Sequence, residues 1–141
     1  MSRVVAPLAA LFGLFVIAGT QSMAATAADS DILGTHWKLV MVNGQPAESG
    51  RREPHLIFKP DGGLAGSTGC NNLAAVYTLD GNQLAFGPIM TTRMYCQEVA
   101  RTERELLKNL PDVAGWTIDG DRLELVSASG ATIAVLEKTA E

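Results

Sequence analysis

The chain has 141 residues and carries 11 Lys and Arg against 15 Asp and Glu, a formal net charge of −4 at pH 7. This length predicts one domain with a core of its own. The mildly acidic balance, with its charges scattered along the chain, argues against a protein that binds a phosphate backbone, and we expect no nucleic acid among its partners.

The N-terminal segment has the organisation of a cleavable secretory signal. Arg3 is the only charge in the first 28 residues, and an uninterrupted apolar run covers 8–18. That run is shorter than the roughly 20 residues that a spanning helix needs. The small residues after it predict cleavage after Ala24, with Ala27 as the second choice. An uncleaved N-terminal anchor is the alternative.

Cleavage has consequences for location and composition. No cysteine lies near either cleavage site, so we expect no lipid attachment, no stable membrane anchor after cleavage and a periplasmic or secreted protein. Loss of Arg3 leaves 10 Lys and Arg against 15 Asp and Glu. The expected organisation is a signal over 1–24, a flexible lead over 25–32 and one domain over 33–138.

Beyond the lead, the sequence predicts short strands separated by turns. Asn43-Gly44 is a strong hairpin signal because both residues accept positive φ. Strands this short at near-regular spacing favour an antiparallel sheet that curls into a barrel or sandwich. The expected strands are 37–42, 56–59, 64–68, 75–79, 83–86, 115–118, 122–126 and 132–136.

One segment, 97–110, has a period of 3.6 and is expected to be an amphipathic helix that ends at Pro111. Its apolar stripe is Val99, Leu106, Leu107 and Leu110, and its wet side is Glu98, Arg101, Glu105 and Lys108. Arg101 and Glu105 stand four apart and can pair weakly. The fold class is therefore α+β: a small, curved, barrel-like antiparallel sheet of about eight strands with one helix packed on it.

The two cysteines, Cys70 and Cys96, favour a disulfide, since an even count in an oxidising compartment is typical of paired thiols. Two buried free thiols are the alternative. A bridge would join the turn 66–72 to the irregular segment 87–96. Arg93, beside it, either bonds carbonyl groups of these turns or receives an anionic group of a partner.

Motifs that carry catalysis are mostly absent. His36 and His55 lack the spacing of metal ligands, and Ser67 lacks the G-x-S-x-G context of a nucleophile. We expect no enzymatic activity, no cofactor and no metal. Two alternatives remain open: an enzyme inhibitor that uses the loop 87–96, and a small hydrolase that combines Ser67, His55 and a turn aspartate.

Several strings of the sequence closely resemble the META domain family, which includes the HslJ-like heat-shock proteins. They are G-S-T-G-C-N-N, then L-D-G-N-Q-L-A-F-G-P-I-M-T-T-R-M-Y-C before the charged helix, with G-T-H-W-K-L-V-M-V-N-G-Q-P at the start and I-D-G-D-R-L-E-L-V near the end. The resemblance covers about 33–138. It departs at Gln97, where many relatives have proline.

The resemblance implies an exported or envelope-anchored protein without assigned catalysis, linked to heat shock and antibiotic tolerance, in which the two cysteines pair. We therefore expect a non-enzymatic envelope protein, monomeric and stress-related, that binds a protein partner or an apolar, lipid-like ligand. The candidate partner-binding residues are Asn71, Thr92 and Arg93. The candidate lining of an apolar groove is Leu106, Leu107 and Leu110.

Overall fold

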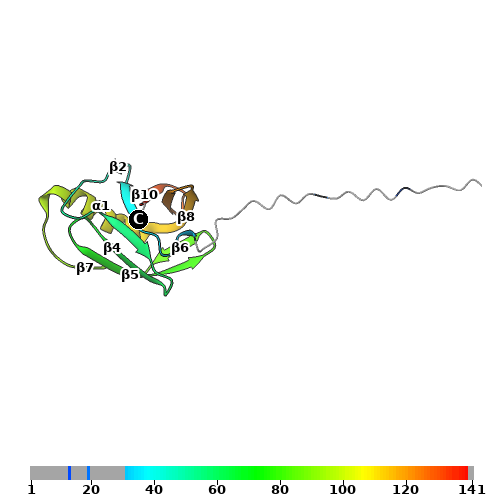
Figure 1. Ribbon diagram of the computed structural model, residues 1–141, viewed down its shortest axis with the longest axis horizontal. Coiled ribbons are helices and arrows are strands. Elements are labelled where there is room, and N and C mark those ends of the chain that lie inside the picture. Colours follow the sequence, from blue (N-terminus) through cyan, green and yellow to red (C-terminus); the bar gives the residue numbers. More distant parts are fainter. Residues whose placement is uncertain (1–12, 14–18, 20–30, 140–141) are drawn as a thin grey trace, which may run out of the picture.

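The computed structural model describes residues 13, 19 and 31–139, and its strands close into an antiparallel barrel (Figure 1). Eight strands form the barrel and two short ones, β2 and β7, are added to it. The strands are β1 (Trp37–Val42), β2 (Gln45–Pro46), β3 (His55–Phe58), β4 (Gly63–Ser67), β5 (Asn72–Asp80), β6 (Gln83–Phe86), β7 (Met90–Thr91), β8 (Val113–Asp119), β9 (Arg122–Ser127) and β10 (Thr132–Lys138). The predicted α+β class is confirmed.

The strand order is β10-β9-β8-β6-β5-β4-β3-β1, and β1 also pairs with β10, which closes the ring. Most neighbours share long ladders, but the β6–β8 seam is short. It has one register pair, Gln83 with Gly115, and a backbone hydrogen bond of 3.0 Å from the Trp116 N–H to the Asn82 carbonyl. The seam therefore contributes less backbone pairing than the other joints of the barrel.

The turn chemistry in the sequence locates the strands well. β1 and β6 have the expected bounds, and Asn43 and Gly44, at φ 49° and 74°, make the turn between β1 and β2. The sequence did not indicate β2 or β7, because two paired residues carry no periodicity. β5 begins earlier than expected, since Asn72 pairs with Ser67 instead of remaining in the turn.

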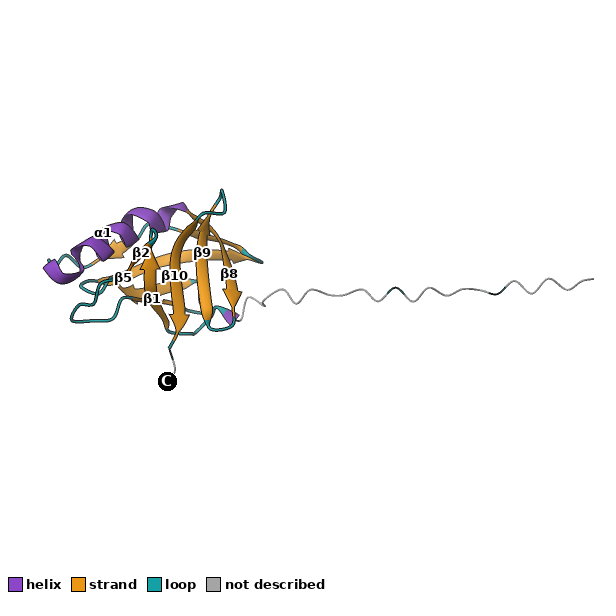
Figure 2. Ribbon diagram, turned by 90° about the horizontal axis from the view of Figure 1, so that it is seen from above, coloured by secondary structure: helices purple, strands orange, loops and turns teal. Residues whose placement is uncertain are grey.

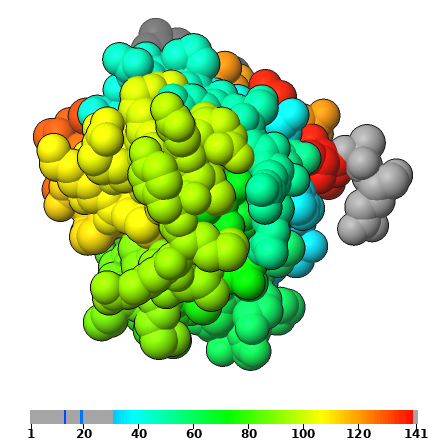
Figure 3. Space-filling model, turned by 90° about the vertical axis from the view of Figure 1, so that its left-hand side faces the viewer, coloured from blue at the N-terminus to red at the C-terminus, as the bar shows by residue number. Residues whose placement is uncertain are grey.

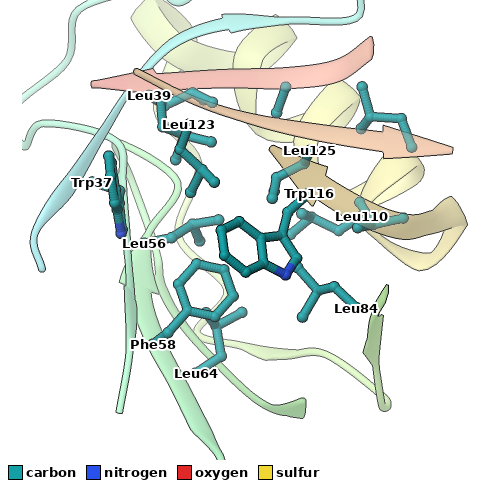
Figure 4. Close-up of a cluster of buried hydrophobic side chains, with 14 of the residues drawn as sticks. Trp37, Leu39, Leu56, Phe58, Leu64, Leu84, Leu110, Trp116, Leu123 and Leu125 are labelled. Carbon is teal, nitrogen blue, oxygen red and sulfur yellow. The ribbon is translucent and has the colours of Figure 1, made fainter. Parts of the chain in front are cut away.

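Large apolar side chains from opposite walls fill the barrel (Figure 4). Trp116 projects from β8 towards Phe58 on β3 and Leu84 on β6. Its indole N–H donates to the Gly81 carbonyl at 3.0 Å, so this buried ring leaves no polar group unpaired. Burial of these apolar side chains, most of them leucines, is the main favourable contribution to closing the barrel.

The predicted signal, apart from residues 13 and 19, and most of the predicted lead lie outside the described residues. Ile32, which the sequence assigns to the flexible lead, is fully buried in the core. The Trp37 indole N–H donates to its carbonyl at 3.0 Å, and the next residue, Leu33, forms a bridge with Phe58. The ordered domain therefore begins before residue 33.

The helix lies against one end of the barrel (Figure 2). It comprises the 3-10 turn η2 (Gln97–Val99), α1 (Ala100–Asn109) and the 3-10 turn η3 (Leu110–Asp112). Val99, Leu106 and Leu110 are buried as the stripe predicts, and so is Thr102. In the described part of the chain, no helix has the length and apolar character needed to cross a bilayer.

The loop residue Glu48 caps the helix from outside it. The Glu48 backbone N–H donates to Thr102 Oγ1 at 2.8 Å, and the Thr102 backbone N–H donates to Glu48 Oε2 at 3.0 Å. Arg101 Nε lies 3.3 Å from Glu48 Oε1, so the partner of Arg101 is Glu48 and not the predicted Glu105. Glu105 instead accepts a 3.0 Å hydrogen bond from the Asn43 side chain.

This cap predicts a pH-dependent contribution to stability. The hydrogen bond from the Thr102 backbone, aided by Arg101, holds the pKa of Glu48 below its usual 4.5. A folded-state pKa below the unfolded one contributes stability at neutral pH, and that stability is lost as pH falls through the folded value. Glu48→Gln should therefore destabilise the protein at pH 7 and have little effect well below pH 4.5.

Urea unfolding at both pH values measures this difference. Glu98→Gln, which removes an exposed carboxylate at the start of the helix, is the matched control and should show a smaller dependence on pH. An equal effect of Glu48→Gln at both pH values would contradict the assigned cap.

Candidate functional site

A disulfide between Cys70 and Cys96, with their Cα atoms 5.7 Å apart, joins the β4–β5 turn to the start of the helix. This confirms the pairing expected from the sequence. Gly69 precedes the bridge at φ 95°, a conformation that side-chain-bearing residues rarely adopt. A Cβ at Gly69 would also lie 3.3 Å from a methyl group of Val99, so glycine lets the turn approach the helix closely.

The buried side chain of Asn71 holds the loop 92–94. Its Oδ1 accepts hydrogen bonds from the Thr92 hydroxyl at 2.9 Å and the Met94 backbone N–H at 2.7 Å. Its Nδ2 donates to the Met94 carbonyl at 3.0 Å and to Glu103 Oε2 at 2.7 Å. Two acceptor and two donor positions are thus used, which is the full capacity of an amide.

Glu103 ties this network to the helix. Its Oε2 also accepts the hydroxyl proton of Thr68, while Thr68 Oγ1 accepts the backbone N–H of Asn71 at 2.9 Å. Glu103 was not among the site residues predicted from the sequence. A signal was present: Glu103 stands four residues after Val99 and three before Leu106, so it lies on the apolar stripe, where a carboxylate needs partners.

The three candidate partner-binding residues have different surroundings. Asn71 is 2% exposed and, with Thr92, forms the internal network. Arg93 is exposed and forms no hydrogen bond or ion pair with any residue between 31 and 139. The sequence offered Arg93 as a donor to carbonyl groups of these turns, but Asn71 donates to the Met94 carbonyl instead. The guanidinium of Arg93 is therefore available to solvent.

Four large hydrophobic side chains are exposed on neighbouring segments of the described domain. Val76, Met90, Met94 and Tyr95 are 63%, 68%, 54% and 81% exposed. Met90 pairs with Ala74 on β5, and Gly87 N–H bonds the Val76 carbonyl at 2.8 Å, so these side chains follow β5, β7 and the loop after it. Figure 3 shows this yellow-green part of the chain in the foreground. We call these four residues the apolar face.

A cleft of about 390 Å³ lies between the segment that follows β6 and the C-terminal part of the helix. Of the candidate groove residues, only Leu107 reaches it. Leu106 and Leu110, at 1% and 0% exposure, belong to the core, so this cleft is not lined by all three leucines as predicted. The lining residues are Phe86, Gly87, Pro88, Ile89, Thr91, Leu107 and Pro111.

The hydrolase alternative gains no support from the geometry. His55 and Ser67 are register partners on β3 and β4, but their side chains form no hydrogen bond with each other. The Ser67 hydroxyl accepts the Gly69 N–H at 3.0 Å, and His55 Nδ1 lies 2.9 Å from the Glu53 carbonyl while its ring stacks on His36. Within residues 31–139 no three His, Cys, Asp or Glu side chains gather as metal ligands would.

Comparisons with known proteins agree with this architecture. The family model of the META domain matches residues 30–140. An NMR structure of a protein from Burkholderia xenovorans is similar with a TM-score of 0.63 at 21% identity, covering 100% of this chain and 97% of that one. A crystal structure of a DUF4847 family protein from Bacteroides vulgatus has a TM-score of 0.60 at 13% identity, covering 82% and 99%. At such identities the likeness concerns the fold alone. No curated protein gives a significant match.

Proposed function

Because the chain belongs to the META domain family, we propose that it is a non-enzymatic, exported protein of the cell envelope that binds an apolar ligand or an apolar segment of a partner. The cleft beside Leu107 is the proposed binding site, and the cleft is the observation that carries the proposal. We also propose that the protein takes part in the response to envelope stress.

The chemistry of the cleft supports an apolar occupant. Phe86, Ile89 and Leu107 supply its hydrophobic walls, and two prolines stiffen its rim. Its volume of about 390 Å³ is at the lower end of the range for small-molecule sites and suits a short alkyl chain or one aromatic ring.

The scaffold around the cleft is held in place before any ligand arrives. The disulfide fixes the end of the segment 87–96 at Cys96. Asn71 holds the same segment at Thr92 and Met94 through hydrogen bonds. A rigid site loses less conformational entropy on binding than a mobile one. The network around Asn71 therefore supports binding without contacting the ligand.

Titration with a fluorescent apolar dye tests the cleft. Leu107→Glu places a charge in the cleft wall and should weaken dye binding at least tenfold, because an apolar group cannot solvate a carboxylate. Lys108→Glu, a neighbouring exposed residue outside the lining, is the matched control and should bind as the wild type does. Equal binding by both variants would contradict the assignment.

Native mass spectrometry then addresses the natural ligand. Protein isolated by mild extraction should carry an added mass of lipid-like size, and Leu107→Glu should lose it. A clean apo mass for the wild type would count against a tightly held small ligand and leave the protein-segment form of the proposal.

Enzyme inhibition is the second candidate, and the exposure of Met94 and Tyr95 on a disulfide-locked loop favours it. An inhibitor presents such anchors to an enzyme on a rigid loop. Inhibition of an envelope protease that disappears with Tyr95→Ala but persists with Leu107→Glu would support this candidate over the first.

A further inference from the structure

Two arginines stand beside the apolar face. The guanidinium of Arg52 donates to Asn72 Oδ1, and the Asn72 carbonyl accepts the Thr92 N–H at 3.2 Å. Arg93 is the next residue in the chain. Both arginines are exposed, and Arg93 is the only charged residue in the segment 87–96. A chain with a net charge of −4 thus presents local positive charge beside its exposed hydrophobic side chains.

We propose that this face docks on the headgroup region of an anionic lipid bilayer. Met90, Met94 and Tyr95 enter the interface, while Arg52 and Arg93 contact lipid phosphates. None of these five residues lines the cleft beside Leu107, so the inference goes beyond the proposed function.

The side-chain types fit a bilayer. Tyrosine favours the membrane interface because its ring is apolar and its hydroxyl stays hydrated. Arginine forms paired hydrogen bonds to phosphate and keeps its charge at the interface while its stem lies among apolar groups. Methionine adapts its flexible, unbranched chain to an irregular surface.

The extent of the surface favours lipid over a protein partner. A stable protein interface buries about 800 Å² on each side and involves roughly 20–30 residues per partner. The apolar face has four large hydrophobic residues. A bilayer needs no matching shape, and a few anchors together with cationic groups give reversible attachment to it.

Co-sedimentation with vesicles tests the proposal. The wild type and every variant are expressed from the full sequence with its own leader and purified in the same way, and mass spectrometry checks that all have the same N-terminus, so any contribution from residues 1–30 is constant. We expect binding to vesicles of equal parts phosphatidylglycerol and phosphatidylcholine and much weaker binding to pure phosphatidylcholine. Arg93→Ala should weaken binding about fivefold, and Met94→Ser/Tyr95→Ser should weaken it tenfold or more.

Arg122→Ala is the matched control for charge, because Arg122 is an exposed arginine on β9, away from the apolar face. It should bind as the wild type does. A decrease equal to that of Arg93→Ala would show that net charge, and not this face, governs binding, and would overturn the proposal.

Tyr95→Trp reports insertion directly. The two native tryptophans, Trp37 and Trp116, are buried at 1% and 3% exposure, so a red-shifted component of the emission arises from position 95. That component should move to the blue with anionic vesicles. An unchanged spectrum despite co-sedimentation would place the contact elsewhere and reject the proposal.

Two further outcomes separate the possibilities. Failure to bind either kind of vesicle, with binding to polyglutamate that Arg93→Ala abolishes, would assign the surface to an acidic protein and overturn the bilayer proposal. Leu107→Glu should lose dye binding but retain vesicle binding. An experiment that rejects ligand binding in the cleft can therefore be told apart from one that rejects docking of the apolar face on a bilayer.

Discussion

Asn71→Ala is expected to lower the free energy of unfolding by about 3 kcal/mol. The substitution removes four hydrogen bonds at once. It leaves the Met94 N–H and carbonyl without their side-chain partner, and the Glu103 carboxylate keeps only its bond from the Thr68 hydroxyl in this network. Each buried polar group that loses its partner costs about 1–3 kcal/mol, and water at the partly buried edge of the network recovers part of that. Urea unfolding with the disulfide intact measures the loss.

Asn72→Ala is the matched control, since Asn72 is the next residue, is exposed, and has one side-chain hydrogen bond, from Arg52. It should cost well under half as much. Equal stability of the Asn71→Ala and Asn72→Ala variants would show that the network around Asn71 contributes no more to the stability of the fold than one exposed hydrogen bond. Asn71→Asp should be destabilising at neutral pH because it places a second carboxylate beside Glu103, which like charges disfavour.

Removal of the disulfide, by Cys70→Ser/Cys96→Ser, is expected to cost about 3–4 kcal/mol. The bridge closes a loop with a sequence separation of 26, and its loss allows the unfolded chain many more conformations. Reduced wild-type protein should unfold at the same urea concentration as the double variant. Oxidised and reduced wild type with the same midpoint would contradict this expectation.

The two effects should not add. Both the bridge and Asn71 restrain the segment 87–96, one at Cys96 and the other at Thr92 and Met94. Restraints that share one segment couple, and the combined variant should lose less than the sum of the separate losses. A strict sum would mean that the two act on independent parts of the fold.

Local chemistry explains which parts of the fold could be predicted from the sequence. Asn43-Gly44 specifies a turn by itself, and the alternation along β5 follows the burial of Leu73, Ala75 and Tyr77. Closure of the ring by β1 and β10 could not be predicted, because residues such as Trp37 and Lys138 pair across almost the whole domain. No short-range pattern encodes such a contact.

The candidate site shows the same division. The pairing of the two cysteines, which joins the turn 66–72 to the segment 87–96, was predicted from their even number and the expected oxidising compartment and was also implied by the family resemblance. The helix period placed Leu106 and Leu107 on one stripe but could not decide which of them faces the core and which the cleft, since that depends on how the helix is rotated against the barrel. The contact of Glu103 with Thr68 and Asn71 spans over thirty residues and needed the fold itself.

The short β6–β8 seam gives the barrel a compliant joint. Phe86 at the end of β6 and Pro111 just before β8 both line the cleft, so the joint and the cleft share their borders. Local opening costs least where few backbone hydrogen bonds must break. We therefore expect local opening of the barrel to begin at this joint or at the β1–β3 joint, which has two register pairs, and opening at β6–β8 would widen the cleft beside Leu107.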